Sequence, residues 1–185
     1  SAARHKIDAK LYCTIHHETK NKTLRTKLKK TTKGLLITNT TASFNFSEEV
    51  AKLASRVSHA VRRDKKNVIL VTSVAENEGK STVAVNLALA MEQKGKRVLL
   101  IDCDLRKPAC GMVLGQSKFT YGLNDILGGK ENLSECFRRY QNSDMYMLLA
   151  KRGEQNTGDL LISPRMNALL DWARECFDFI VLDLP

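Results

Sequence analysis

The sequence predicts an α/β fold, in which a parallel β-sheet is covered by helices on both faces. Two observations carry this prediction. Short runs that are apolar at every position, as in buried parallel strands, alternate along the chain with segments whose apolar residues recur with the 3.6-residue period of a helix. The chain has 185 residues, of which 43% are hydrophobic. This is enough for one domain with a sizeable core, since a domain has about 100–200 residues.

The first amphipathic segment is expected to begin near Ser47. A serine can cap the start of a helix, and the acidic residues Glu48 and Glu49 suit its positive end. Apolar residues then recur at helical spacing on one face, and these are Val50, Leu53, Ala54, Val57 and Val61. This face is expected to pack against the sheet.

Four strands and three more helices are expected after this segment. The expected strands are Val68–Val71, Arg97–Ile101, Met145–Ala150 and Phe179–Leu182. The expected helices are Thr82–Gln93, Leu123–Leu127 and a last one that ends at about Cys176. Ser163 is expected to cap that last helix, with Pro164 in its first turn.

The segment between the first strand and the next helix has the pattern of a phosphate-binding loop. Gly79-Lys80-Ser81 follows a strand and opens a helix, where backbone N–H groups and the helix dipole attract an anion. Glycine lets the backbone approach the phosphate closely, and Lys80 would reach the β- and γ-phosphates. Ser81 would offer its hydroxyl to Mg²⁺. The candidate nucleotide-binding residues are Asn77, Glu78, Gly79, Lys80, Ser81 and Thr82.

The loop departs from the usual spacing in two ways. Val74 stands where that spacing has a glycine. Asn77 is expected to take the place of a glycine, because asparagine tolerates left-handed backbone angles. Glu76 and Glu78 bring two negative charges next to an anion site, which weakens binding unless both side chains point outward.

Acidic residues follow two of the expected strands. Asp102 and Asp104 come directly after the second strand, and Asp183 comes after the fourth. The carboxyl ends of parallel strands form the ligand-binding edge of an open α/β sheet, so Lys80 and the three aspartates could converge there. Three carboxylates around one point repel each other, and Mg²⁺ with nucleotide phosphates would offset their charge. These motifs predict a P-loop NTPase-like fold with a nucleotide and Mg²⁺ as ligands, and they place Ser81, Asp102 and Asp183 where they could face that metal.

Positive charge is concentrated in the first quarter of the chain. The formal net charge is +10, and residues 1–47 hold 10 Lys and Arg against 2 Asp and Glu. Residues 18–34 hold seven Lys and Arg, one Glu and few side chains to bury. Such a block indicates contact with nucleic acid or an anionic membrane, or is a solvated linker. We therefore expect residues 1–34 to be a mobile basic linker and residues 35–185 to be the folded domain.

The five cysteines show no spacing that indicates a metal or redox motif. They are Cys13, Cys103, Cys110, Cys136 and Cys176, and no C-x-x-C pair occurs among them. Free thiols in a reducing cytosol are the simplest interpretation. No apolar run approaches the roughly 18 residues that a membrane-spanning helix needs, so an integral membrane fold is not expected.

Three segments resemble the bacterial tyrosine kinases of capsule and exopolysaccharide synthesis. They are Gly79–Thr82, Ile101–Pro108 and Asp178–Asp183, which look like the Walker A, A′ and B motifs of that family. The resemblance covers roughly residues 35–185. Partition ATPases share the fold but carry an extra lysine early in the loop, where this chain has Ala75.

The resemblance implies ATP and Mg²⁺ as ligands, and tyrosine hydroxyls as acceptors of the γ-phosphate in an autokinase reaction. By motif match, Lys80 would neutralise phosphate charge, and Asp102 would act as a base or orient the metal near the attacking hydroxyl. Asp104 would support Asp102. Ser81 would coordinate Mg²⁺, and Asp183 would hold it through water. The family's sheet continues with further strands, so the domain is expected to be truncated after the Walker B strand.

The resemblance also implies a place on the cytoplasmic face of the bacterial inner membrane. Members of this family pair with a chain-length-determinant membrane protein, or are fused to such a membrane domain, and associate into rings. Residues 18–34 would then lie against anionic lipid, and no nucleic acid is expected as a partner. Two alternatives remain open, namely a partition-type ATPase with a DNA-binding basic arm and a catalytically inactive interaction module.

Overall fold

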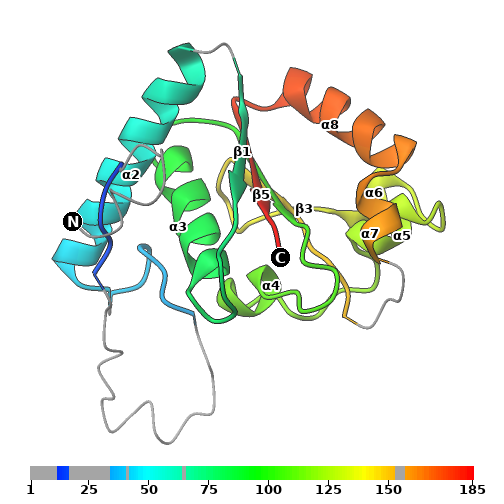
Figure 1. Cartoon of the computed structure of the whole chain (residues 1–185), viewed down its shortest axis with the longest axis horizontal. Helices are drawn as coiled ribbons and strands as arrows, with labels where there is room; N and C mark the ends of the chain where they lie inside the picture. The colour runs from blue at the N-terminus through cyan, green and yellow to red at the C-terminus, as the bar shows by residue number, and fades with distance from the viewer. Residues whose placement is uncertain (1–11, 17–33, 41, 64–65, 153–156) are drawn as a thin grey trace, which may run out of the picture.

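The computed structural model describes residues 12–16, 34–40, 42–63, 66–152 and 157–185 (Figure 1). Its centre is a five-stranded sheet with the order β1-β5-β2-β4-β3. The strands are β1 (Val68–Val71), β2 (Val98–Asp102), β3 (Phe137–Arg139), β4 (Met145–Leu148) and β5 (Phe179–Asp183). All neighbours are parallel except β3, which pairs antiparallel with β4 at one edge. The predicted α/β fold with a parallel sheet is therefore confirmed, and all four expected strands are present.

Alternate residues of the central strands face two separate apolar cores. In β2, Leu100 faces the core beneath α2 (Phe44–Arg63) and α3 (Lys80–Glu92), whereas Leu99 faces the core beneath α5 (Leu123–Leu127) and α8 (Pro164–Cys176). Figure 1 shows these two pairs of helices on opposite sides of the sheet. Strands buried on both faces have no polar alternation, which explains why they appear in the sequence as continuous apolar runs.

The start of α2 differs from the prediction. The helix begins at Phe44, and the hydroxyl of Ser43 accepts a hydrogen bond from the Phe46 backbone N–H at 3.1 Å, so Ser43 and not Ser47 caps it. The prediction was wrong because Ser47 stands just before the periodic apolar residues, whereas the helix extends one turn further back. The apolar face itself is confirmed, since Val50 and Ala54 are buried.

Four short elements were not predicted. They are α4 (Cys110–Val113), α6 (Leu133–Cys136), α7 (Thr157–Leu161) and β3. None is long enough to display a period, and β3 has two arginines among its three residues. The last helix agrees with the prediction, because the Ser163 hydroxyl accepts a hydrogen bond from Met166 N–H and Pro164 occupies the first turn.

The expected basic linker, residues 1–34, lies outside the described residues except for residues 12–16 and Gly34, so its mobility stays a prediction. The segment of residues 12–16 lies against α2: Arg56 donates a hydrogen bond to the Tyr12 carbonyl, and His16 pairs with Glu49. No helix in the described part of the chain is both long and apolar enough to span a bilayer.

Asn86 of α3 links the chain segment before α2 to the core by hydrogen bonds. Its side-chain oxygen accepts a hydrogen bond from Ile37 N–H at 2.7 Å, and its amide donates to the carbonyls of Leu35 and Thr82, both at 2.8 Å. The residue is fully buried. It therefore pairs with two backbone groups of this half-buried segment, the Ile37 N–H and the Leu35 carbonyl.

Replacing Asn86 with alanine is expected to lower the free energy of unfolding by about 3 kcal/mol, because three buried hydrogen bonds are lost. Urea denaturation monitored by circular dichroism measures this. The matched control is Asn167→Ala on the exposed side of α8, which should change the value by less than about 0.5 kcal/mol. Equal effects of the two variants would contradict the role given to Asn86.

Candidate nucleotide-binding site

The loop between β1 and α3 contains two residues with left-handed backbone angles. Asn77 has φ 63° and Gly79 has φ 88°, so both are left-handed. The expectation that Asn77 substitutes for a glycine is confirmed in this respect. A Cβ at Gly79 would meet nothing within 4 Å, so the backbone angle, and not crowding by the protein, accounts for glycine there.

The two glutamates of the loop lie differently. Glu76 pairs at the surface with Lys107, with 2.6 Å between Oε1 and Nζ. Glu78 turns back onto its own loop, where its Oε2 accepts hydrogen bonds from the backbone N–H groups of Val74 at 3.0 Å and Ala75 at 3.1 Å. The backbone N–H groups at the beginning of the loop therefore stabilise its negative charge. This contact does not need a glycine at position 74, where this chain has Val74.

Lys80, the first residue of α3, forms an ion pair with Asp104. Its Nζ lies 2.9 Å from Asp104 Oδ2, and both side chains are largely buried. Burial acts against the charged amine, but the hydrogen bond to Asp104 and the charge of Asp183 outweigh it and raise the pKa of Lys80. Burial likewise opposes ionisation of Asp104, but its bonds from Lys80 and the Lys107 backbone lower its pKa. Both members of the pair are therefore ionised.

Asp102, the last residue of β2, is held by three backbone N–H groups. Its Oδ2 accepts from Ala109 at 3.1 Å and from Cys110 at 3.0 Å, and its Oδ1 accepts from Asp104 at 3.2 Å. The side chain is fully buried. Burial, followed by the charge of Asp183, raises the pKa of Asp102 to about 7 in spite of these bonds.

Asp183, the last residue of β5, lies directly beside Asp102 in the strand register. Its Oδ2 accepts a hydrogen bond from the Cys110 thiol at 3.3 Å. Its Oδ1 is buried and has no hydrogen-bond partner among the described residues. Burial raises the pKa of Asp183, although the Ser81 hydroxyl and the charge of Lys80 act in the opposite direction.

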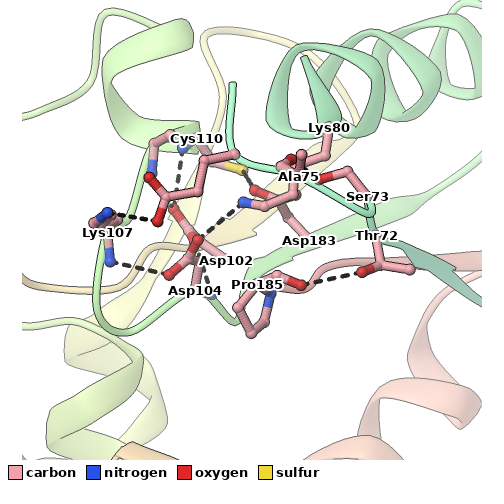
Figure 2. A network of polar contacts seen from close by, with 12 residues as sticks. Thr72, Ser73, Ala75, Lys80, Asp102, Asp104, Lys107, Cys110, Asp183 and Pro185 are labelled. Atoms are coloured by element: carbon pink, nitrogen blue, oxygen red, sulfur yellow. Dashed lines mark hydrogen bonds and ion pairs between the residues drawn. The ribbon is translucent and has the colours of Figure 1, made fainter. Parts of the chain in front are cut away.

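The predicted convergence of Lys80 with the three aspartates is confirmed in space, as Figure 2 shows. One ligand atom each from Asp102, Cys110 and Asp183 lies within 4.8 Å of the others. Ser81 is buried next to Asp183, and Thr82 follows on α3. A buried carboxylate oxygen without a partner, beside a second carboxylate and a hydroxyl, fits a divalent cation such as Mg²⁺. Which residues of the site touch a nucleotide stays a prediction.

Cys110 is the residue of this site that the sequence did not indicate. Its position in the chain, eight residues after Asp102 and in no motif, carries no signal. The structure brings it to the site because α4 begins at Cys110 with its N–H groups directed at Asp102. Burial, followed by the charges of Asp102 and Asp183, raises the pKa of the Cys110 thiol, so the thiol is protonated and donates.

The fold is that of a P-loop NTPase-like domain. The AAA domain family matches residues 66–185, which is more than half of the chain. The tyrosine-protein kinase wzc of Salmonella typhi is 33% identical over 138 residues, which cover 75% of this chain and 19% of that protein. The chain belongs to the AAA domain family, and it is similar over part of its length to bacterial tyrosine-protein kinases.

Solved structures agree with the fold. The kinase domain of the Escherichia coli tyrosine kinase ETK has a TM-score of 0.78 at 24% identity, covering 99% of this chain and 71% of that chain. The septum site-determining protein MinD from Pyrococcus horikoshii, complexed with Mg-ADP, has a TM-score of 0.57 at 26% identity, covering 64% of this chain and 49% of that chain. The chain spans about a fifth of the length of the curated relatives that it matches, 19% of wzc.

The raised pKa of Asp102 predicts how stability depends on pH in the absence of cation and nucleotide. Because its pKa in the folded state, about 7, exceeds the ordinary 3.8, the folded state favours the protonated form. The associated stability is fully present below about pH 4 and is lost as pH rises through 7, by up to about 4 kcal/mol.

Asp183→Asn is expected to flatten this dependence, because it removes the negative charge that opposes ionisation of Asp102. The free energy of unfolding is measured from pH 4 to 8 for wild type, Asp183→Asn and the exposed control Asp171→Asn. The control should follow wild type. An Asp183→Asn curve parallel to wild type would show that the two carboxylates do not interact.

Proposed function

We propose that this site binds ATP with Mg²⁺ and transfers the γ-phosphate to a tyrosine hydroxyl, as in a tyrosine autokinase of capsule or exopolysaccharide synthesis. The observation that supports this most is a buried oxygen of Asp183, which has no hydrogen-bond partner in the described part of the chain and lies near Ser81, Asp102 and the Lys80–Asp104 pair. Similarity to bacterial tyrosine-protein kinases supports the choice of acceptor. The Mg-ADP complex of the similar MinD protein supports the choice of ligand.

Each residue has a role that follows from its contacts. Lys80, kept charged by Asp104, would exchange that partner for the nucleotide phosphates and neutralise their charge. Ser81 and Asp183 would hold Mg²⁺, which when bound neutralises charge that develops on the phosphates. Asp102 is fully buried and accepts hydrogen bonds from three backbone N–H groups. These features favour a role in orienting the metal site over direct contact with the tyrosine hydroxyl. The N–H groups of residues 77–81 would receive the phosphate oxygens.

Lys80→Met is expected to weaken binding of Mg-ADP by about 10- to 100-fold, because a hydrogen bond to a charged group contributes about 1.5–3 kcal/mol. Isothermal titration calorimetry measures the affinity. Lys52→Met serves as control, since Lys52 also pairs with an acidic residue, Glu48, but its side chain is exposed on the surface of α2. Equal affinities of wild type and Lys80→Met would contradict the phosphate role of Lys80.

The acceptor is tested in a kinase assay on the full chain. Wild type and Lys80→Met are incubated with labelled ATP and Mg²⁺, and phosphotyrosine is detected. The proposal predicts label on tyrosine in wild type and a loss of at least about 100-fold in the variant. If the protein binds nucleotide but forms no Lys80-dependent phosphotyrosine, the result would favour an inactive interaction module.

We further propose that residues 18–34 contact an anionic membrane surface and that the protein works beside a chain-length-determinant membrane protein, with self-association into a ring. Seven positive charges against one negative charge support the membrane contact. A place at the cytoplasmic face of the inner membrane follows from this arrangement. The near-neutral body of the chain, 20 Lys and Arg against 18 Asp and Glu in residues 48–185, gives no support for a DNA-binding domain.

Replacing Lys27, Lys29 and Lys30 by glutamine is expected to weaken binding to anionic vesicles by about 3 kcal/mol, since each such charge contributes about 1 kcal/mol at the surface. Sedimentation with vesicles of anionic or neutral lipid measures this. The control replaces Lys52, Lys94 and Lys118. Tight DNA binding with a steep salt dependence, without vesicle binding, would instead favour the partition-type ATPase.

A further inference from the structure

Cys110 contacts both carboxylates of the site at once. Its backbone N–H donates to Asp102 and its thiol donates to Asp183, from the first residue of α4. The three potential ligand atoms, one sulfur and two oxygens, lie within 4.8 Å of one another, and all three residues are buried. Figure 2 shows the sulfur directed at the Asp183 carboxylate. The buried thiol adds a potential sulfur ligand, which a site made of carboxylates and hydroxyls alone does not have.

An independent observation indicates that this cluster favours a positively charged ligand. Asp183 is 0% exposed, and its Oδ1 has no hydrogen-bond partner among the described residues, although the neighbouring Asp102 is also acidic. Two buried carboxylates side by side with one oxygen unsatisfied are unfavourable unless a proton or a cation compensates their charge. The ligand atoms are close enough to meet around one ion after small shifts, since tetrahedral ligands lie about 2.0–2.3 Å from Zn²⁺.

We propose that Asp102, Cys110 and Asp183 form a site for a thiophilic divalent cation of the zinc class, which competes with Mg²⁺ for the same carboxylates. Thiolate ligands select zinc over magnesium, whereas carboxylates alone suit magnesium. On binding, an Sγ–Zn bond forms, the S–H bond breaks and its proton leaves to the buffer. Three protein ligands leave the fourth position of a tetrahedral ion for water. Because the site shares Asp102 and Asp183 with the proposed nucleotide site, zinc would block Mg-ATP binding.

The test uses Zn²⁺ alone, added to chelator-treated protein without nucleotide and measured by competition with a fluorescent zinc chelator. Wild type should bind one equivalent, and Cys110→Ser should bind it at least about tenfold more weakly, since even a lost outer-shell partner has that effect. The control is Cys176→Ser, a partly exposed cysteine outside the cluster, which should bind zinc like wild type. Equal zinc affinity in wild type and Cys110→Ser would overturn the proposal.

Binding of Co²⁺ to wild type is a second measurement, and its result does not depend on whether Cys110→Ser folds. A cobalt–thiolate site shows an intense charge-transfer absorption in the near ultraviolet, so this band should appear with wild type and with Cys176→Ser. Its absence in wild type would overturn the proposal.

Failure of the zinc site and failure of the proposed function are distinguishable, because Mg-ADP binding is measured separately in wild type without zinc. One outcome is that wild type binds zinc, Cys110→Ser does not, and wild type shows no Mg-ADP binding. This outcome would support the cation site and refute the nucleotide site. Mg-ADP binding that one equivalent of Zn²⁺ abolishes in wild type, but not in the presence of a zinc chelator, would support both. Mg-ADP binding unaffected by bound zinc would refute the competition.

Discussion

The site depends on the repulsion between two buried carboxylates. Asp102 and Asp183 end adjacent parallel strands in the same register, and both are fully buried. The nearby Lys80 compensates them only in part, because its Nζ forms an ion pair with Asp104. The three N–H groups on Asp102 and the thiol on Asp183 stabilise the pair only in part, since one oxygen of Asp183 has no partner among the described residues. This leaves a place where a cation is favourable.

The order of the strands creates this arrangement. Because β5 lies between β1 and β2, the last strand in the chain brings Asp183 between the loop that follows β1 and the aspartates that follow β2. The loop then presents the first turn of α3 to the same edge, and α4 directs its N-terminus at Asp102. Segments more than 70 residues apart thus meet, as in the contact between Cys110 and Asp183. Such a site at the carboxyl edge of a sheet is the usual place for ligands in open α/β folds.

The sequence predicted the parts of this structure that have a strong local signal. Apolar runs such as Phe179–Leu182 predicted the buried strands, and Gly79-Lys80-Ser81 with the strand-end aspartates predicted which side chains meet. It did not predict β3 or α4, which are too short for a period, nor the start of α2 at Phe44. It also gave no sign of Cys110, because a thiol outside a spaced motif becomes significant only through contacts that the fold creates.

The most direct test of the nucleotide site is a crystal structure of this chain with Mg-ADP. We expect Lys80 Nζ to leave Asp104 and bind the β-phosphate, the N–H groups of residues 77–81 to surround that phosphate, and Mg²⁺ to lie beside Ser81 and Asp183. A structure in which nucleotide binds elsewhere, with the 2.9 Å contact between Lys80 and Asp104 intact, would contradict this expectation.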